Sequence, residues 1–61
     1  MANNDVEEVT LHNRTPETLM IAFIGSRGNE RRILLASNQV AELEVKKNPL
    51  GNYYFAINPA K

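Results

Sequence analysis

The residues of this chain that are able to take part in catalysis are few and scattered. The one histidine is His12, and because the chain has no cysteine, it has no thiolate to activate. Ser26 and Ser37 lie in turn-like sequences, not in the strand–turn–helix context that exposes a serine nucleophile. The sequence therefore predicts no catalytic residues, and we expect neither enzymatic activity nor a small-molecule substrate.

The carboxylates do not form a metal-binding pattern. Their spacing matches neither an EF-hand nor a zinc site, so no metal and no cofactor is expected. Glu42 and Glu44 lie two residues apart, as in a catalytic carboxylate pair, but Lys46 and Lys47 follow them, which favours a solvated charged face. The segment G-S-R-G-N (25–29) lacks the following helix of a phosphate site and is predicted to be a hairpin tip.

Four arginines form the strongest candidate group for binding a charged partner. Three of them lie on or just after the expected hairpin, and one precedes the second strand: Arg27, Arg31, Arg32 and Arg14. Such a group is suited to RNA phosphates or to an acidic protein surface. The alternative is an ordinary solvated hairpin end, which is favoured by Glu30 within the group and by the balance of seven basic and seven acidic residues.

The elements that must position these residues are short strands. Alternating or continuous apolar residues predict five of them, at 6–13, 19–24, 31–36, 40–47 and 53–58. Glycine, proline and asparagine separate them, and only 39–47 also suits a helix. We expect an all-β fold, a five-stranded antiparallel meander folded as a half-sandwich or small barrel. Residues 1–5 are predicted to be a flexible polar arm and 6–61 a single domain.

The strand at 19–24 is apolar on both sides. Leu19, Ile21 and Phe23 point one way and the residues between them point the other way, whereas a sheet in so short a chain builds one core. The second face predicts a protein partner or a homo-oligomer. The expected interface residues are Met20, Ala22, Ile24, Leu34 and Tyr54. In the alternative, a tightly curled barrel buries strand two and the N-terminal arm covers its outer side.

Size and composition agree with a docking role. A 61-residue chain without cysteine has a small core and no disulfide, so oligomerisation or docking on a larger body is the expected source of extra stability. No apolar run is long enough for a membrane span, and the N-terminus M-A-N-N-D-V-E-E is unlike a secretory signal. We expect an intracellular or virion location, with no membrane partner.

Two resemblances suggest functions. The chain resembles small Ig-like modules of viral capsid decoration and accessory proteins in the order of its segments. That order is V-T-L-x-N-x-T, an apolar strand, a Gly-rich hairpin, an alternating strand and an aromatic last strand. This resemblance implies a non-enzymatic structural module, such as a bacteriophage capsid decoration (cement) protein. Separately, E-T-L-M-I (17–21) and G-S-R-G-N-E-R-R-I (25–33) resemble the carbon storage regulator family of translational repressors. That resemblance implies a small dimeric protein that binds GGA-containing RNA, with Arg14 as an RNA contact.

Overall fold

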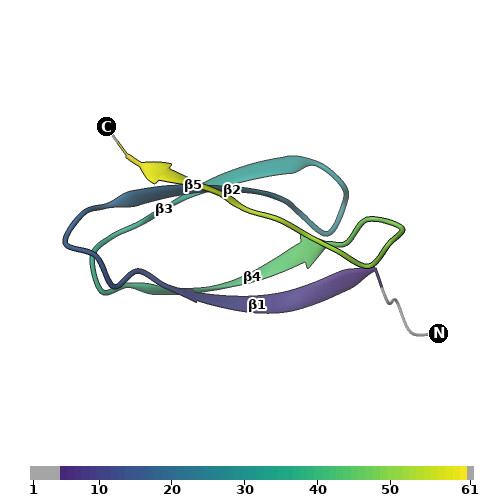
Figure 1. Cartoon of the computed structure of the whole chain (residues 1–61), viewed down its shortest axis with the longest axis horizontal. Helices are drawn as coiled ribbons and strands as arrows, with labels where there is room; N and C mark the ends of the chain where they lie inside the picture. The colour runs from purple at the N-terminus through teal and green to yellow at the C-terminus, as the bar shows by residue number, and fades with distance from the viewer. Residues whose placement is uncertain (1–4, 61) are drawn as a thin grey trace.

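The chain folds as two packed layers of antiparallel strands. In a computed structural model, which describes residues 5–60, the strands are β1 (Val6–His12), β2 (Leu19–Ile24), β3 (Glu30–Leu35), β4 (Val40–Lys46) and β5 (Ala56–Pro59). One layer has the order β1-β4 and the other the order β3-β2-β5 (Figure 1). The predicted all-β fold with five antiparallel strands is thus confirmed, in the form of a half-sandwich. Residues 5–60 include no helix long and apolar enough to cross a membrane.

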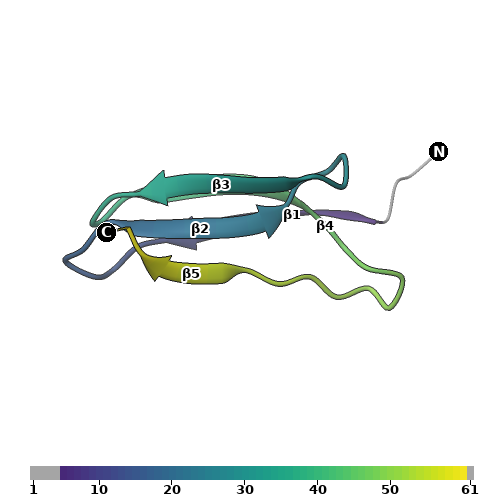
Figure 2. The same cartoon turned by 90° about the horizontal axis from the view of Figure 1, so that it is seen from above.

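The connectivity differs from the expected meander. Only β2 and β3 are consecutive strands that pair with each other, whereas β1 pairs with β4 along seven residues and β5 pairs with β2. The loop after β4 is a tight turn, in which Asn48 Oδ1 accepts hydrogen bonds from the backbone N–H of Leu50 at 3.0 Å and of Asn52 at 2.9 Å. This turn does not close a hairpin, because it carries the chain from the β1–β4 layer to the other layer (Figure 1). Figure 2 shows β3, β2 and β5 side by side in that other layer.

The last strand is shorter and begins later than predicted. Its ladder with β2 starts where Ala56 faces Ala22, so residues 53–55 cross between the layers before the strand begins. Aromatic packing holds this crossing segment in place. The Phe55 ring lies 6.1 Å from that of Phe23 and 5.8 Å from that of Tyr53, in tilted and edge-to-face arrangements typical of aromatic pairs.

The core lies between the two layers. Its buried apolar side chains among the described residues are Ile21, Phe23, Leu35 and Val45, of which Ile21 and Val45 are fully buried. Partly buried side chains complete it, namely Val9, Leu11, Leu19, Ile33, Ala41, Leu43 and Phe55. The alternation predicted for strands two and four is therefore confirmed, with Leu19, Ile21 and Phe23 facing inward on β2. Burial of each large side chain contributes about 1.5 to 3 kcal/mol, so four buried residues make a small core.

A buried asparagine joins the two layers at one end of the sandwich. Asn13 is 2% exposed, and its Nδ2 donates to the carbonyl oxygens of Glu17 at 2.7 Å and Leu35 at 2.8 Å. Its Oδ1 accepts from the backbone N–H of Thr15 at 2.9 Å and from the Thr15 hydroxyl at 2.7 Å. The side chain therefore fixes the β1–β2 connection to the end of β3, with every polar atom of its amide paired.

The N-terminal arm expected at residues 1–5 is described only at its last residue, and residues 1–4 lie outside the described part. Asp5 is fixed to the end of β4, because its carbonyl accepts from the Lys47 N–H at 2.7 Å and its carboxylate pairs with Lys46 at 3.0 Å. Glu7 already lies in β1 and pairs with Lys47 at 3.5 Å. Asp5 thus extends the ordered β1–β4 layer.

Candidate interaction surface

The register of the three-stranded sheet gathers the apolar side chains that point away from the core. Residues directly opposite one another share a face, so Met20 lies beside Leu34, and Ala22 lies between Arg32 and Ala56. Ile24 faces Glu30 in the same way. We call this the outer face; it consists of Met20, Ala22, Ile24, Glu30, Arg32, Leu34, Tyr54, Ala56 and Asn58. All five residues predicted to form an interface lie on it.

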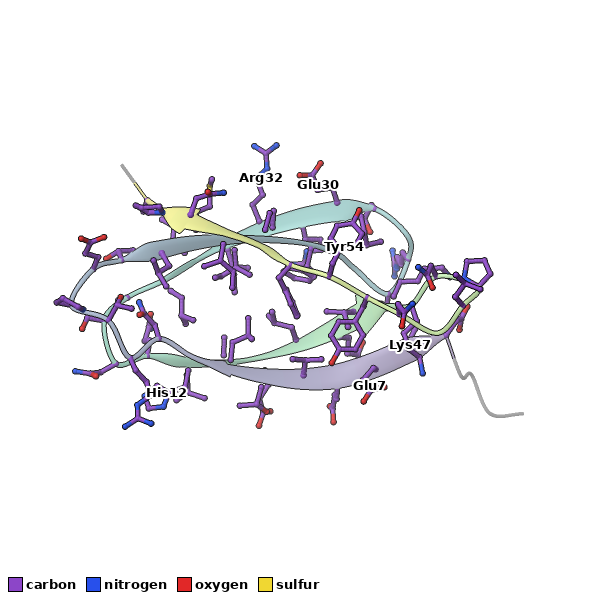
Figure 3. The ribbon with its side chains drawn as sticks, in the orientation of Figure 1. Glu7, His12, Glu30, Arg32, Lys47 and Tyr54 are labelled. Carbon is purple, nitrogen blue, oxygen red and sulfur yellow. The ribbon has the colours of Figure 1, made fainter. Side chains whose placement is uncertain are left out.

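The outer face is open to solvent. Leu34 is 66% and Tyr54 71% exposed, and the three apolar residues of β2 on this face are half-buried. Within residues 5–60 the strands form two separate sheets and not a closed barrel, and no described residue covers Leu34 or Tyr54. Residues 1–4 of the arm, which the alternative placed over strand two, lie outside the described part. Figure 3 shows Arg32, Glu30 and Tyr54 on the side of the sheet that faces away from β1 and β4. Apolar groups exposed together in this way are typical of interaction surfaces.

The centre of the outer face is a shallow hollow. It has a volume of about 210 Å³ and is lined by Ala22, Phe23, Ile24, Glu30, Tyr54 and Ala56. Its floor consists of two alanines, because Ala22 and Ala56 lie directly opposite each other on adjacent strands. Small side chains flanked by large ones leave room for a protruding apolar side chain of a partner.

One ion pair lies on this face. Arg32 Nε is 3.3 Å from Glu30 Oε2, and the two side chains are 65% and 56% exposed. An ion pair with this much solvent contact contributes little to the stability of the fold. The pair does, however, place one positive and one negative group side by side along the edge strand β3.

The opposite surface of the molecule has a different character. The outward residues of β1 and β4 include Glu8, Glu42 and Glu44, all exposed, and Glu8 lies directly across from Glu44. Like charges directly opposite each other repel, and water screens them best when the face stays solvated. The described molecule thus has an acidic outer surface on one layer and a largely apolar one on the other.

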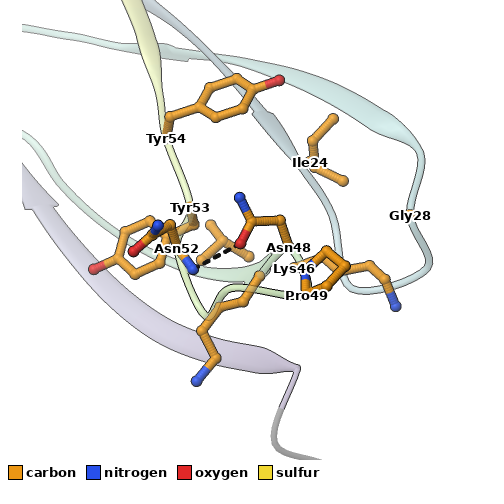
Figure 4. Close-up of a pocket in the computed structure, with 10 residues that line it drawn as sticks. Ile24, Gly28, Lys46, Asn48, Pro49, Asn52, Tyr53 and Tyr54 are labelled. Carbon is orange, nitrogen blue, oxygen red and sulfur yellow. Dashed lines mark hydrogen bonds between the residues drawn. The ribbon is translucent and has the colours of Figure 1, made fainter.

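A cleft adjoins the outer face at the end where the β4–β5 loop passes the β2–β3 hairpin. It has a volume of about 330 Å³, and Tyr53 and Tyr54 line one side of it while Ile24 and Gly28 line the other (Figure 4). Ile24 and Tyr54 border both the cleft and the central hollow. The apolar surface therefore continues from the outer face into this cleft.

The lysine beside the cleft interacts within the chain. Lys46 pairs with Asp5 at 3.0 Å, and this hydrogen bond lowers the pKa of the Asp5 carboxyl below its ordinary value. The neighbouring Lys47 pairs with Glu7 (Figure 3). An anionic ligand in the cleft would have to compete with these carboxylates, so the cleft is better suited to an apolar group.

Only two of the four candidate arginines come together: Arg27 and Arg31 line one hollow at the β2–β3 hairpin, with Ser26 and Asn29. Arg14 follows the end of β1, where His12 faces Val40, whereas Arg27 lies in the β2–β3 turn at the opposite end of the sandwich. Arg31 packs its aliphatic stem against Gly25, where an added Cβ would lie 2.9 Å from Arg31 Cδ. Arg32 belongs to the ion pair on the outer face. These positions do not combine into one basic surface.

The candidate catalytic residues are separated as well. His12 is exposed on the acidic surface, and the Ser37 hydroxyl donates a hydrogen bond to the Thr15 carbonyl at 2.7 Å. Ser26 lies in the hairpin turn at the far end. Within residues 5–60, no group of three histidine, aspartate or glutamate side chains is placed to hold a metal ion.

Sequence reasoning missed two parts of the outer face. It did not place Ala56 there, because the pairing of β5 with β2 is not visible in the sequence. It treated Glu30 and Arg32 as members of a hairpin end, although their two-residue spacing on one strand puts them on one face. That spacing was the available signal for the charged part of the surface.

Comparison with protein-family models, with curated proteins and with solved structures returned no match to this chain.

Proposed function

We propose that this protein is a non-enzymatic interaction module that docks on a larger assembly through its outer face. The observation that carries the proposal is the register of β3-β2-β5, which aligns Met20, Ala22, Ile24 and Leu34 on one exposed side of the sheet. Burial of such a face against a partner removes apolar surface from water, which is the main driving force of protein association.

The small core supports the same proposal. A two-layer fold with four buried apolar side chains gains stability from any surface it buries on a partner, because binding to the folded state alone shifts the folding equilibrium. The acidic surface of β1 and β4 then remains in solvent. Such a division between a docking side and a solvated side suits a small protein that covers part of a larger shell.

The assembly that we propose is a bacteriophage capsid, with the chain as a decoration or accessory protein. This choice rests on the resemblance of the strand and turn order to Ig-like decoration modules. The RNA-regulator alternative would need a surface that contacts phosphates at several points. Arg27 and Arg31 line one hollow, but Arg14 lies at the opposite end of the molecule and Arg32 is paired with Glu30, so the four arginines do not form one such surface.

The experiment is co-sedimentation of the purified chain with capsids of its source. We expect the wild type to sediment with the capsids and Leu34→Lys to remain in the supernatant, because the lysine would have to be buried. Val40→Lys is the matched control: Val40 is 57% exposed on a strand of the other layer and should not affect binding. Both substitutions should change folding stability by less than about 1 kcal/mol.

Equal loss of binding in both variants, or none in either, would contradict docking through the outer face. If the wild type itself stays in the supernatant, the capsid is not its partner. Salt-dependent, saturable binding to a GGA hairpin RNA would then support the regulator instead.

A further inference from the structure

The outer face has an internal pattern that makes it complementary to itself. Across the sheet, one row of side chains runs Ala56, Ala22 and Arg32, because these residues face one another in the two ladders. The next row runs Tyr54, Ile24 and Glu30, which border the central hollow together. The first row carries two small side chains and a positive charge, and the second carries two large side chains and a negative charge.

We propose that two copies of the chain pack these faces together about a twofold axis that crosses the strands between the two rows. Such an axis places each row over the other row of the second copy. Ile24 then lies over the second copy's Ala22, Tyr54 over its Ala56, and Arg32 over its Glu30. Each large side chain meets a small one, and each charge meets its opposite. This inference rests on the proposed docking role. It assigns the rows of Ala22 and Ile24 to a second copy, whereas the neighbouring row of Met20 and Leu34 lies outside these two rows and is the part proposed to dock on the larger assembly.

The hollow explains how two sheets can approach closely at this place. Packed sheets lie about 10 Å apart, with side chains from the two faces interdigitating. The alanine floor at Ala22 and Ala56 leaves a hollow of about 210 Å³, and the twofold axis directs the second copy's Ile24 into it. Because the operation is symmetric, both hollows are filled at once.

The ion pair of Arg32 and Glu30 determines how the two copies are oriented relative to each other. Within one copy, Arg32 and Glu30 are 3.3 Å apart and more than half exposed, so each has room for a second partner. In the dimer the four groups form a closed arrangement in which each guanidinium contacts carboxylates from both copies. Opposite charges across an interface set its register, and like charges would disfavour a shifted packing.

The other surfaces of the described molecule are less suited to self-association. Packing of two β1–β4 surfaces would bring Glu8, Glu42 and Glu44 of both copies together. Edge pairing through β5 is limited by its four-residue length and by Pro59, which lacks a backbone donor. The outer face combines apolar area with balanced charge, so it is the surface through which two copies meet.

The test is charge exchange followed by sedimentation velocity at micromolar to submillimolar concentrations. In a dimer of E30R, positions 30 and 32 of the two copies bring only guanidinium groups opposite one another. In a dimer of R32E, the same positions bring only carboxylates opposite one another. We therefore expect each single variant to raise the dimer dissociation constant at least about tenfold. The double variant E30R/R32E restores opposite charges and should return to within about threefold of wild type. An equimolar mixture of the two single variants should form heterodimers.

E42R is the matched control, because Glu42 is an exposed glutamate on a strand of the other layer, and this variant should dimerise as the wild type does. Circular dichroism melting of all variants shows whether they fold. A monomeric wild type, single variants that dimerise normally, or a double variant as weak as the singles would each overturn this dimer. A monomer that still binds capsids through Leu34 would refute only the dimer. A dimer that does not bind them would refute only the capsid role.

Discussion

Asn13 should contribute more to the stability of this fold than any other single polar side chain. Its amide makes four hydrogen bonds, two donated to the carbonyl oxygens of Glu17 and Leu35 and two accepted from Thr15. At about 1 kcal/mol for each bond, Asn13→Ala should lower the free energy of unfolding by about 3 to 4 kcal/mol. A 61-residue protein has a total unfolding free energy of about 3 to 9 kcal/mol, so the variant should lose between about a third and all of its stability.

Asn13→Asp tests the hydrogen-bond argument with almost no change in shape. The carboxylate can still accept from Thr15, but its second oxygen faces two carbonyl oxygens where the amide donated. This environment favours the protonated form, so the pKa of the introduced carboxyl should be higher in the folded state than its ordinary value of about 3.9. The variant should therefore be most stable below that value and lose stability as the pH rises through the folded-state pKa.

The assay is urea unfolding followed by far-ultraviolet circular dichroism between about pH 4 and pH 7, with exposed Asn58→Ala as the control. The control should change the unfolding free energy by less than about 0.5 kcal/mol. If Asn13→Ala lowers the free energy of unfolding by less than about 1 kcal/mol, the four hydrogen bonds do not each contribute the assigned value of about 1 kcal/mol. An Asn13→Asp variant that becomes more stable toward neutral pH, relative to wild type, would refute the role of the donated bonds.

Two further predictions concern the core and the N-terminal ion pair. Ile21→Ala removes a side chain that is 1% exposed and should lower the free energy of unfolding by about 2 to 5 kcal/mol in the same assay. Ile57→Ala, at a position that is 53% exposed, should lower it far less. Similar losses of stability in the two variants would contradict the assigned core. Lys46→Ala should raise the pKa of Asp5 toward its ordinary value in a nuclear magnetic resonance titration, because the Lys46 hydrogen bond is the main cause of the lowered value. Because the pKa of Asp5 is lowered in the folded state, the pair stabilises the fold at pH values above the ordinary pKa of the carboxyl. This stabilisation is lost as the pH falls through the folded-state pKa. An Asp5 titration that Lys46→Ala leaves unchanged would exclude the pair.

The local pattern of the sequence was sufficient to place the first four strands and the sides that they present, whereas the last strand begins three residues later than predicted. Alternation has a period of two residues and depends only on the backbone of each strand, so it put Met20, Ala22 and Ile24 on the side away from the core. Gly28, at φ +86°, marked the hairpin turn between β2 and β3, which fixes the register of that pair. The separation of Tyr54 from Tyr53 and Phe55 followed from the same alternation.

The pairing of distant strands was decided by the tertiary structure. Nothing local distinguishes a β4–β5 hairpin from the observed crossing, in which β4 pairs with β1 and β5 with β2. The choice depends on how the inward residues of all five strands bury one another. Loop closure discriminates weakly, because its entropy grows only slowly with the length of the loop. The row that contains Ala22 and Ala56, and therefore the hollow of the outer face, exists only because of this long-range pairing.

Asn13 shows the same division at a single residue. The sequence N-R-T-P-E indicated a turn, and the bonds from Thr15 to Asn13 Oδ1 are of the local kind that asparagine makes in turns. The bond to the Leu35 carbonyl joins residues 22 positions apart and buries the side chain, which no pattern around residue 13 encodes. An amide is stable in the interior only where all its partners converge, and only the packed layers bring Glu17 and Leu35 to the same place.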